Sequence, residues 1–127
     1  MFSGIIEEAA QVKSLTQVGA GWRLTIDCKL PHTNTEIGDS IAVNGCCLTV
    51  VEKKGNSLQF DLLTETMRRT SMGELKVGSR VNVERSLRVG DKISGHFVTG
   101  HIDATSKLLE RKKDGDNDRM LWSIAPE

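Results

Sequence analysis

Short segments in which apolar and polar residues alternate recur along the chain, and each of them predicts a β-strand. These segments are residues 5–6, 22–26, 40–43, 48–51, 58–62 and 81–84. Turn-forming pairs separate them, among them Asn44-Gly45 and Gly55-Asn56. Strands at such close spacing predict a sandwich or a small closed barrel.

One helix is predicted, over residues 64–69. Thr64 can cap its amino end, and Glu65 places a carboxylate in its first turn, where it complements the helix dipole. Further along, residues 110–119 are highly charged and include Gly115 and Asn117. This composition predicts a solvated hairpin loop.

The chain also contains an internal similarity. Ser3-Gly4-Ile5-Ile6-Glu7 is echoed by Thr99-Gly100-His101-Ile102-Asp103, at an offset of 96 (100 − 4). Downstream, residues 11–12 match 107–108 and, with one residue inserted, 22–26 match 119–123. Chance is the alternative explanation, but the echo begins where the first set of strands finishes, which favours a duplication.

The duplication predicts a division of the chain at about residue 95. Residues 1–95 would form one complete barrel, and residues 96–127 would be the truncated start of a second copy. Two strands are fewer than an independent sheet usually needs, so the exposed edge of this second part would need a neighbour, such as another chain.

Charge and composition limit the kinds of molecule that this chain is expected to bind and the compartment in which it is expected to act. The chain has 17 basic and 17 acidic residues, which gives no electrostatic reason to expect nucleic acid or an anionic membrane. Its longest apolar runs are far shorter than a spanning helix, and its start lacks the pattern of a signal peptide. The three cysteines suggest neither a disulfide framework nor a metal site. We therefore expect a cytoplasmic protein.

Cys47 is the first candidate for chemistry. In a strand that follows Asn44-Gly45, side chains alternate between faces, so Cys46, Leu48 and Val50 would share the core face. Cys47 would lie on the other face, beside Thr49. A functional thiol needs exposure and a partner that favours the thiolate. The alternative is that Cys47 is a small buried hydrophobe in a strand covered on both faces.

His96 and His101 form the second candidate, within the segment Gly95-His96-Phe97-Val98-Thr99-Gly100-His101. The glycines leave the backbone uncovered, as is needed where a ligand approaches closely. Histidine transfers protons near neutral pH, but two histidines five residues apart on a strand would point to opposite faces and are poor co-ligands for one metal. Both could equally be hydrogen-bonded structural residues.

Residues 61–66 form the third candidate. Their backbone N–H groups and hydroxyls could hydrogen-bond a polar ligand such as a sugar-like chain or a heterocycle. A plain helix cap is the alternative reading of this segment.

Taken together, these segments resemble the riboflavin synthase family, whose members carry two lumazine-binding barrels. The resemblance rests on residues 1–6, 43–50, 60–68, 75–78, 81–85 and 95–102. Within them, Asn-Gly-Cys-Cys-Leu-Thr-Val and Gly-His-x-x-x-Gly-His are the most specific blocks. The match covers nearly the whole chain, and the family's two barrels would explain the internal similarity.

The resemblance implies an all-β fold, a six-stranded Greek-key closed barrel with one short helix. It implies a reaction in which one 6,7-dimethyl-8-ribityllumazine donates a four-carbon unit to another, giving riboflavin and 5-amino-6-ribitylaminopyrimidinedione. The resemblance also implies that no metal or redox cofactor takes part. In such enzymes the two substrates stack between barrels of neighbouring subunits in a homotrimer, so orientation would account for much of the rate.

The resemblance also assigns roles to residues of this chain. Cys47 would be a nucleophile or proton relay at the lumazine, and His101 a base for the acidic methyl group of its ring. The residues expected to contact the ligand are Gly4, Ile5, Ile6, Ser40, Cys47, Leu48, Thr49, Asp61, Leu62, Leu63, Thr64, Glu65, Thr66, Gly100, His101 and Ile102.

The chain departs from the family in length, because most of a second barrel is missing. We therefore expect a chain that binds a lumazine or riboflavin but is a weak synthase or none. One alternative is a non-catalytic antenna protein that binds lumazine or flavin, although such proteins tend to lose the cysteine and the histidine. The other is a plain barrel used for protein assembly.

Overall fold

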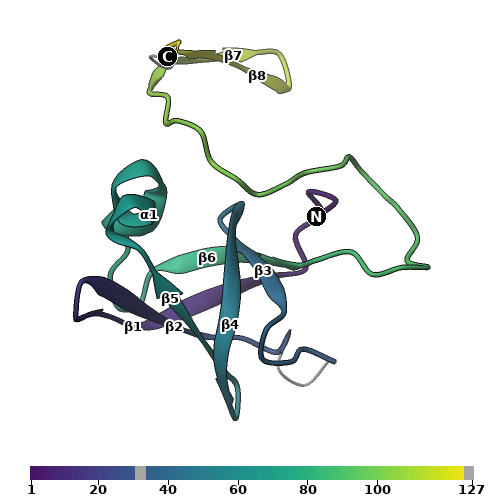
Figure 1. Ribbon diagram of the computed structural model, residues 1–127. Helices are drawn as coiled ribbons and strands as arrows, with labels where there is room; N and C mark the ends of the chain where they lie inside the picture. The colour runs from purple at the N-terminus through teal and green to yellow at the C-terminus, as the bar shows by residue number, and fades with distance from the viewer. Residues whose placement is uncertain (31–33, 125–127) are drawn as a thin grey trace.

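Six antiparallel strands close into a barrel in the computed structural model, which describes residues 1–30 and 34–124 (Figure 1). The strands are β1 (Glu8–Val18), β2 (Gly21–Asp27), β3 (Ser40–Val43), β4 (Cys46–Lys54), β5 (Ser57–Leu62) and β6 (Arg80–Arg85). Their order around the barrel is β1-β2-β5-β4-β3-β6, and β6 pairs back with β1. The predicted all-β closed barrel is therefore confirmed.

The connections between strands are those of a Greek key. Strands β3, β4 and β5 follow one another, and β6 returns to lie beside β3. The turn between β3 and β4 is Asn44-Gly45, and both residues have positive φ angles, 46° and 81°. The Asn44 Oδ1 accepts a 2.8 Å hydrogen bond from the Asn82 amide, which joins this turn to β6.

The core fills the barrel because alternate residues of each strand point inward. On β4, Cys46, Leu48 and Val50 are buried, as predicted, and β5 contributes Phe60, which is fully buried. The other apolar residues of the core are Ala10, Val12, Leu24, Ile26, Cys28, Leu30, Ile41, Val43, Leu58, Leu62, Met72, Val81 and Val83.

Helix α1 (Thr64–Arg69) has the predicted bounds, but its capping differs from the prediction. The N-cap position is Leu63, which makes no side-chain cap. The Thr64 hydroxyl instead donates a 2.8 Å hydrogen bond to the Ala20 carbonyl, so it ties the start of the helix to the β1–β2 turn. A 3₁₀ turn, η2 (Ser71–Glu74), follows and buries Met72 completely.

The strand predictions differ from the structure near the amino terminus in two respects. Residues 5–6 are not in a strand, and Ile5 is 54% exposed. The long strand β1 was not predicted. A register shift in β1 between Val12 and Ser14 breaks the alternation of polar and apolar residues on which the prediction depended.

Beyond the barrel, strands β7 (Leu108–Asp114) and β8 (Asn117–Trp122) form a two-stranded hairpin (Figure 1). The prediction of a hairpin loop over residues 110–119 was therefore wrong in extent, because the turn is much shorter. Charges that suggested a loop pair across the strands instead: Arg111 contacts Asp118 at 2.7 Å, and Arg119 contacts Asp114 at 3.1 Å. All residues of both strands are exposed.

The β7–β8 hairpin has the register of the β1–β2 hairpin. Val12 pairs with Ile26, and Leu108 (12 + 96) pairs with Trp122 (26 + 96). The register shift follows immediately in both hairpins. The offset is thus constant at 96, and the predicted one-residue insertion was wrong. Val12 and Ile26 are buried in the barrel, whereas Leu108 and Trp122 are 45% and 53% exposed.

Among the residues that the structure describes, no helix is both long and apolar enough to cross a membrane.

Candidate ligand-binding site

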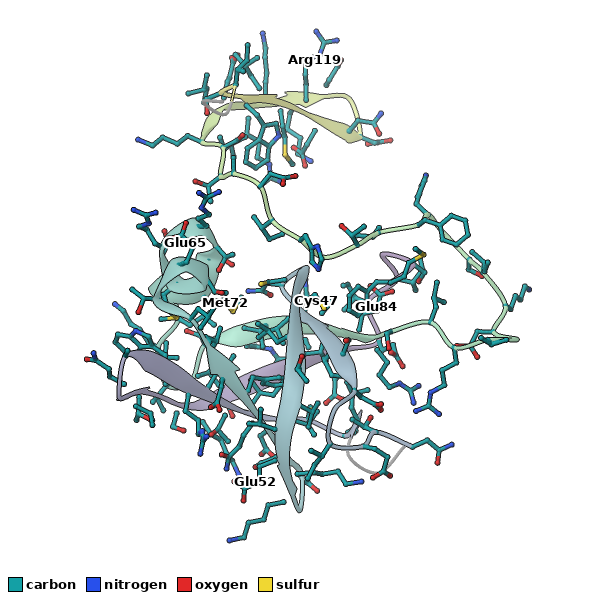
Figure 2. The ribbon with its side chains drawn as sticks, in the orientation of Figure 1. Cys47, Glu52, Glu65, Met72, Glu84 and Arg119 are labelled. Atoms are coloured by element: carbon teal, nitrogen blue, oxygen red, sulfur yellow. The ribbon has the colours of Figure 1, made fainter. Side chains whose placement is uncertain are left out.

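A pocket of about 210 Å³ lies where the start of β4, helix α1 and residues 100–102 meet. Figure 2 shows Cys47 at the same end of the barrel as Glu65, whereas Glu52, also on β4, lies toward the opposite end. The lining residues are Cys46, Cys47, Glu65, Thr66, Arg69, Thr70, Gly100, His101 and Ile102. Three segments that are distant in the sequence therefore build one site.

Gly100 brings the third segment onto the barrel. The Cys47 amide donates a 2.9 Å hydrogen bond to the Gly100 carbonyl oxygen. A Cβ atom at position 100 would lie 2.9 Å from the Cys47 Cβ and 3.0 Å from the Phe2 Cε2, and the φ angle of Gly100 is +78°. Only glycine suits both this approach and this backbone conformation.

Cys47 is the accessible thiol of the three cysteines. It is partly exposed and lies on the face of β4 that points away from the core, as predicted, whereas Cys28 and Cys46 are buried. Burial raises the pKa of the Cys28 thiol to about 11 and also raises the pKa of Cys46. The two buried cysteines are therefore held as unreactive thiols at neutral pH.

Of the two candidate histidines, only His101 lines the pocket, and it is exposed there. Its amide lies 3.4 Å from the Thr99 hydroxyl oxygen. His96 is also exposed, and its amide donates a 2.9 Å hydrogen bond to the Ser3 carbonyl. The lining thus includes the His101 imidazole, a possible proton-transfer group, and the partly exposed Cys47 thiol, a possible nucleophile.

Helix α1 supplies the charged part of the lining. The Glu65 carboxylate accepts hydrogen bonds from Arg68, at 2.8 and 3.0 Å, and from Arg69. These hydrogen bonds from Arg68 and Arg69 lower the pKa of Glu65. Arg69 and Thr70 line the pocket but were not predicted. They lie one helical turn after Glu65 and Thr66, and that periodicity could have identified them.

Six of the predicted contact residues line this pocket: Cys47, Glu65, Thr66, Gly100, His101 and Ile102. Others lie outside it on β4 and β5. Leu48 and Leu62 face the core, at 6% and 2% exposure, and Thr49 points outward. Asp61 is paired across the sheet with Arg23 at 2.8 Å, and hydrogen bonds from Arg23 lower the pKa of Asp61.

The remaining predicted residues are placed as follows. Ser40 pairs with Thr49 at the start of β3. Leu63 is 73% exposed at the start of the helix, and Thr64 is bonded to the β1–β2 turn.

The predicted amino-terminal contacts also lie outside this pocket. Gly4 faces Val98, since a Cβ atom on Gly4 would lie 3.7 Å from its Cγ2. Ile5 lines a separate, more polar cavity of about 520 Å³, whereas Ile6 lines neither cavity and is 45% exposed.

Within residues 1–30 and 34–124, no three His, Cys, Asp or Glu side chains are grouped so that they could hold a metal ion. The polar groups available to a ligand in the pocket are therefore the thiol, imidazole, hydroxyl, carboxylate, guanidinium and backbone groups described above.

The fold and the site define a small antiparallel barrel with a pocket of about 210 Å³ at one end. Residues 3–86 match the family described as the lumazine binding domain. The chain belongs to this family, as its sequence motifs predicted.

Curated relatives match almost the whole of this chain. The riboflavin synthase of Bacillus subtilis (strain 168) is 43% identical over 116 residues, which cover 90% of this chain and 54% of that protein. The riboflavin synthase of Escherichia coli (strain K12) is 41% identical over 125 residues, which cover 96% of this chain and 57% of that protein. The chain therefore spans about half the length of the curated relatives it matches.

Solved structures of LumP share the fold. LumP complexed with 6,7-dimethyl-8-(1'-D-ribityl) lumazine matches with a TM-score of 0.81 and 28% identity, covering 98% of this chain and 69% of that chain. LumP complexed with riboflavin also matches with a TM-score of 0.81 and 28% identity, covering 98% of this chain and 67% of that chain.

Proposed function

We propose that this chain binds 6,7-dimethyl-8-ribityllumazine and riboflavin in the pocket between β4, helix α1 and residues 100–102. We also propose that it forms part of a riboflavin synthase. The observation that carries the proposal is the convergence of Cys47, Thr66 and His101, from three separate segments, on one pocket. The family match and the ligands of the similar LumP structures support it.

The chemistry of the lining fits such a ligand. Cys46, Cys47 and the backbone at Gly100 offer a surface for a flat heterocycle, and the Thr66 hydroxyl can hydrogen-bond a ribityl chain. The Thr70 hydroxyl donates its proton to the Thr66 carbonyl, so it could only accept a further bond from the ligand. At about 210 Å³ the pocket is smaller than the ~300–1,000 Å³ of typical ligand sites. We infer that a second surface completes the site, as expected if it lies between barrels of a homotrimer.

In the reaction we propose, one lumazine donates a four-carbon unit to a second, giving riboflavin and 5-amino-6-ribitylaminopyrimidinedione without a metal or redox cofactor. Cys47 would act as a nucleophile or proton relay. His101 would take a proton from the methyl group on the lumazine ring. Residues 1–95 would be the first lumazine-binding repeat and residues 96–127 the start of a second, in a cytoplasmic enzyme.

A second candidate function is that of a non-catalytic lumazine or flavin binder. The similarity to LumP favours it, because LumP is found in complex with the lumazine, with riboflavin and with flavin mononucleotide. The pairing of Cys47 with His101 in one pocket favours the enzyme.

Titration with riboflavin, followed by flavin fluorescence, tests the site. We expect saturable quenching, weakened about tenfold by His101→Ala, which corresponds to about 1.4 kcal/mol. His96→Ala is the matched control, because His96 is also exposed but does not line the pocket. Binding that is absent up to millimolar riboflavin would overturn both the enzyme and the antenna interpretation.

A second measurement separates catalysis from binding. In D₂O, NMR can follow loss of the proton signal of the lumazine's acidic methyl group. If His101 acts as a base, the chain should accelerate this exchange, and His101→Ala should abolish the acceleration even at saturating lumazine. Tight binding with no accelerated exchange would instead identify a passive binder.

A further inference from the structure

Glu84 on β6 has a buried carboxylate, and the hydrogen bonds that it accepts within residues 1–30 and 34–124 come from Ser3 and Gly4 at the amino terminus. Its side chain is 4% exposed. The Oε1 accepts hydrogen bonds from the Ser3 amide at 2.6 Å, the Ser3 hydroxyl at 2.9 Å and the Gly4 amide at 3.0 Å. The Oε2 accepts a further bond from the Gly4 amide at 3.2 Å. Figure 2 shows Glu84 beside the amino-terminal segment.

These hydrogen bonds offset the free-energy cost of burying the Glu84 carboxylate. Burial of a carboxylate is costly unless it is paired or hydrogen-bonded, and Glu84 makes no ion pair within the part of the chain that the structure describes. Backbone N–H groups that bond to a carboxylate form some of the stronger hydrogen bonds in proteins. Glu84 therefore fixes residues 1–4, the amino-terminal arm, against the end of β6.

The arm in turn holds residues 95–102, the strap. Phe2 and Val98 exchange two backbone hydrogen bonds, of 2.7 and 3.0 Å, and the Ser3 carbonyl accepts the His96 amide at 2.9 Å. The contact is close, because a Cβ atom at Gly95 would lie 2.5 Å from the Ser3 carbonyl oxygen.

The far end of the strap is the wall of the pocket. Gly100 packs against Cys47 and Phe2, and it accepts the Cys47 amide hydrogen bond. His101 and Ile102 follow immediately and line the pocket. A continuous series of contacts thus connects Glu84, the arm, the strap and the site, although Glu84 itself does not line the pocket.

We propose that Glu84 is a positioning residue, which holds the strap over Cys47 through the amino-terminal arm. Without its carboxylate, two backbone amides of the arm lose their acceptor, the arm detaches, and the strap with His101 moves away from β4. The effect on lumazine or riboflavin binding rests on the proposed function of the pocket. The effect on Cys47 does not.

Alkylation of Cys47 in the ligand-free chain tests the positioning directly. Glu84→Met removes every acceptor at similar size and should raise the alkylation rate of Cys47 about tenfold or more. Glu84→Gln keeps one acceptor oxygen and should give a smaller increase, a partial rescue by the conservative variant. Glu52→Gln is the matched control and should leave the rate unchanged, because Glu52 lies toward the opposite end of the barrel.

Gly95→Ala tests the same connection without touching Glu84 and serves if Glu84→Met does not fold. Its added methyl group would collide with the Ser3 carbonyl and should also expose Cys47. A Cys47 rate that is unchanged in folded Glu84→Gln and Gly95→Ala overturns the proposal. Equal increases at the buried Cys28 would also overturn it, because they would indicate general unfolding rather than release of the strap.

The ligand supplies the second readout. If the pocket binds riboflavin, Glu84→Gln and Gly95→Ala should weaken that binding while Glu52→Gln does not. If Glu84→Met and Gly95→Ala speed the alkylation of Cys47 but neither the wild type nor any variant binds riboflavin, the positioning role of Glu84 is supported and the proposed function fails. If riboflavin binding is unaffected in variants whose Cys47 is alkylated faster, the strap held by Glu84 does not form part of the riboflavin site, and that part of the proposal is overturned.

Discussion

The Cys47 amide donates a 2.9 Å hydrogen bond to the Gly100 carbonyl oxygen, and a Cβ atom on Gly100 would stand 2.9 Å from the Cys47 Cβ. This relationship places a segment that follows the barrel directly over the exposed cysteine. The two motifs that identified the family, one around each residue, are therefore parts of one structural unit.

Gly100→Ala should weaken riboflavin binding about tenfold or more, because an added methyl group in a packed contact costs about 1–3 kcal/mol. The control is Gly115→Ala. Gly115 has a similar positive φ, +62°, but nothing lies within 4 Å of the added Cβ. Both variants introduce the backbone strain, but only Gly100→Ala adds a close contact, with Cys47 and Phe2 at the pocket. Equal affinities in a fluorescence titration would show that the close approach does not shape the site.

An alkylating reagent at neutral pH should modify Cys47 first, since Cys47 is partly exposed and the other two cysteines are buried. The pKa of Cys28 is raised to about 11, so this thiol stays protonated and unreactive until well above neutral pH. Peptide mass spectrometry would identify the modified site. Riboflavin should slow the modification, and labelling that is indifferent to riboflavin would place the ligand elsewhere.

Phe60→Ala should lower the free energy of unfolding by about 3–5 kcal/mol, because it removes a large, fully buried side chain and leaves a cavity in the barrel. Urea denaturation measures the change. Val89→Ala, at a fully exposed position, should have almost no effect. Similar losses in the two variants would contradict the location of the core.

The barrel should lose stability in acid as the Glu7 carboxylate becomes protonated. Burial tends to raise the pKa of Glu7, but hydrogen bonds from the Arg85 side chain and backbone outweigh it, so the net pKa lies below the ordinary value of 4.5. A lowered pKa in the folded state contributes stability that is present above 4.5 and is lost as pH falls through the folded value.

Glu7→Gln should therefore cost about 1 kcal/mol at neutral pH and less in acid, where the wild-type carboxylate is protonated. Urea denaturation of the wild type and of Glu7→Gln, at neutral pH and again in acid, measures the difference in free energy of unfolding. A cost that is independent of pH would mean that the Glu7 charge does not contribute.

Much of the site could be predicted because local rules apply to it. Strict alternation on β4 assigned Cys46 to the core and Cys47 to the outer face, and the structure agrees. Asn44-Gly45 predicted the turn for the same kind of reason, since few residues adopt positive φ without strain.

Local rules also failed in identifiable places. The register shift between Val12 and Ser14 hid β1, since one extra residue exchanges the two faces of a strand. Thr64 looked like a helix cap, but its hydroxyl bonds to Ala20 on a distant turn. At Thr64 a tertiary contact overrode the local preference.

By itself the sequence determined the family, because its motifs are local, and through the family the closed barrel, which strand spacing alone left open against a sandwich. Strand period also determined the outward-facing cysteine. Only the tertiary structure decided that Gly100 packs on Cys47 and that Glu84 holds the arm on which the strap rests. These contacts join segments far apart in the chain, and their strength depends on burial and distance, which no local pattern encodes.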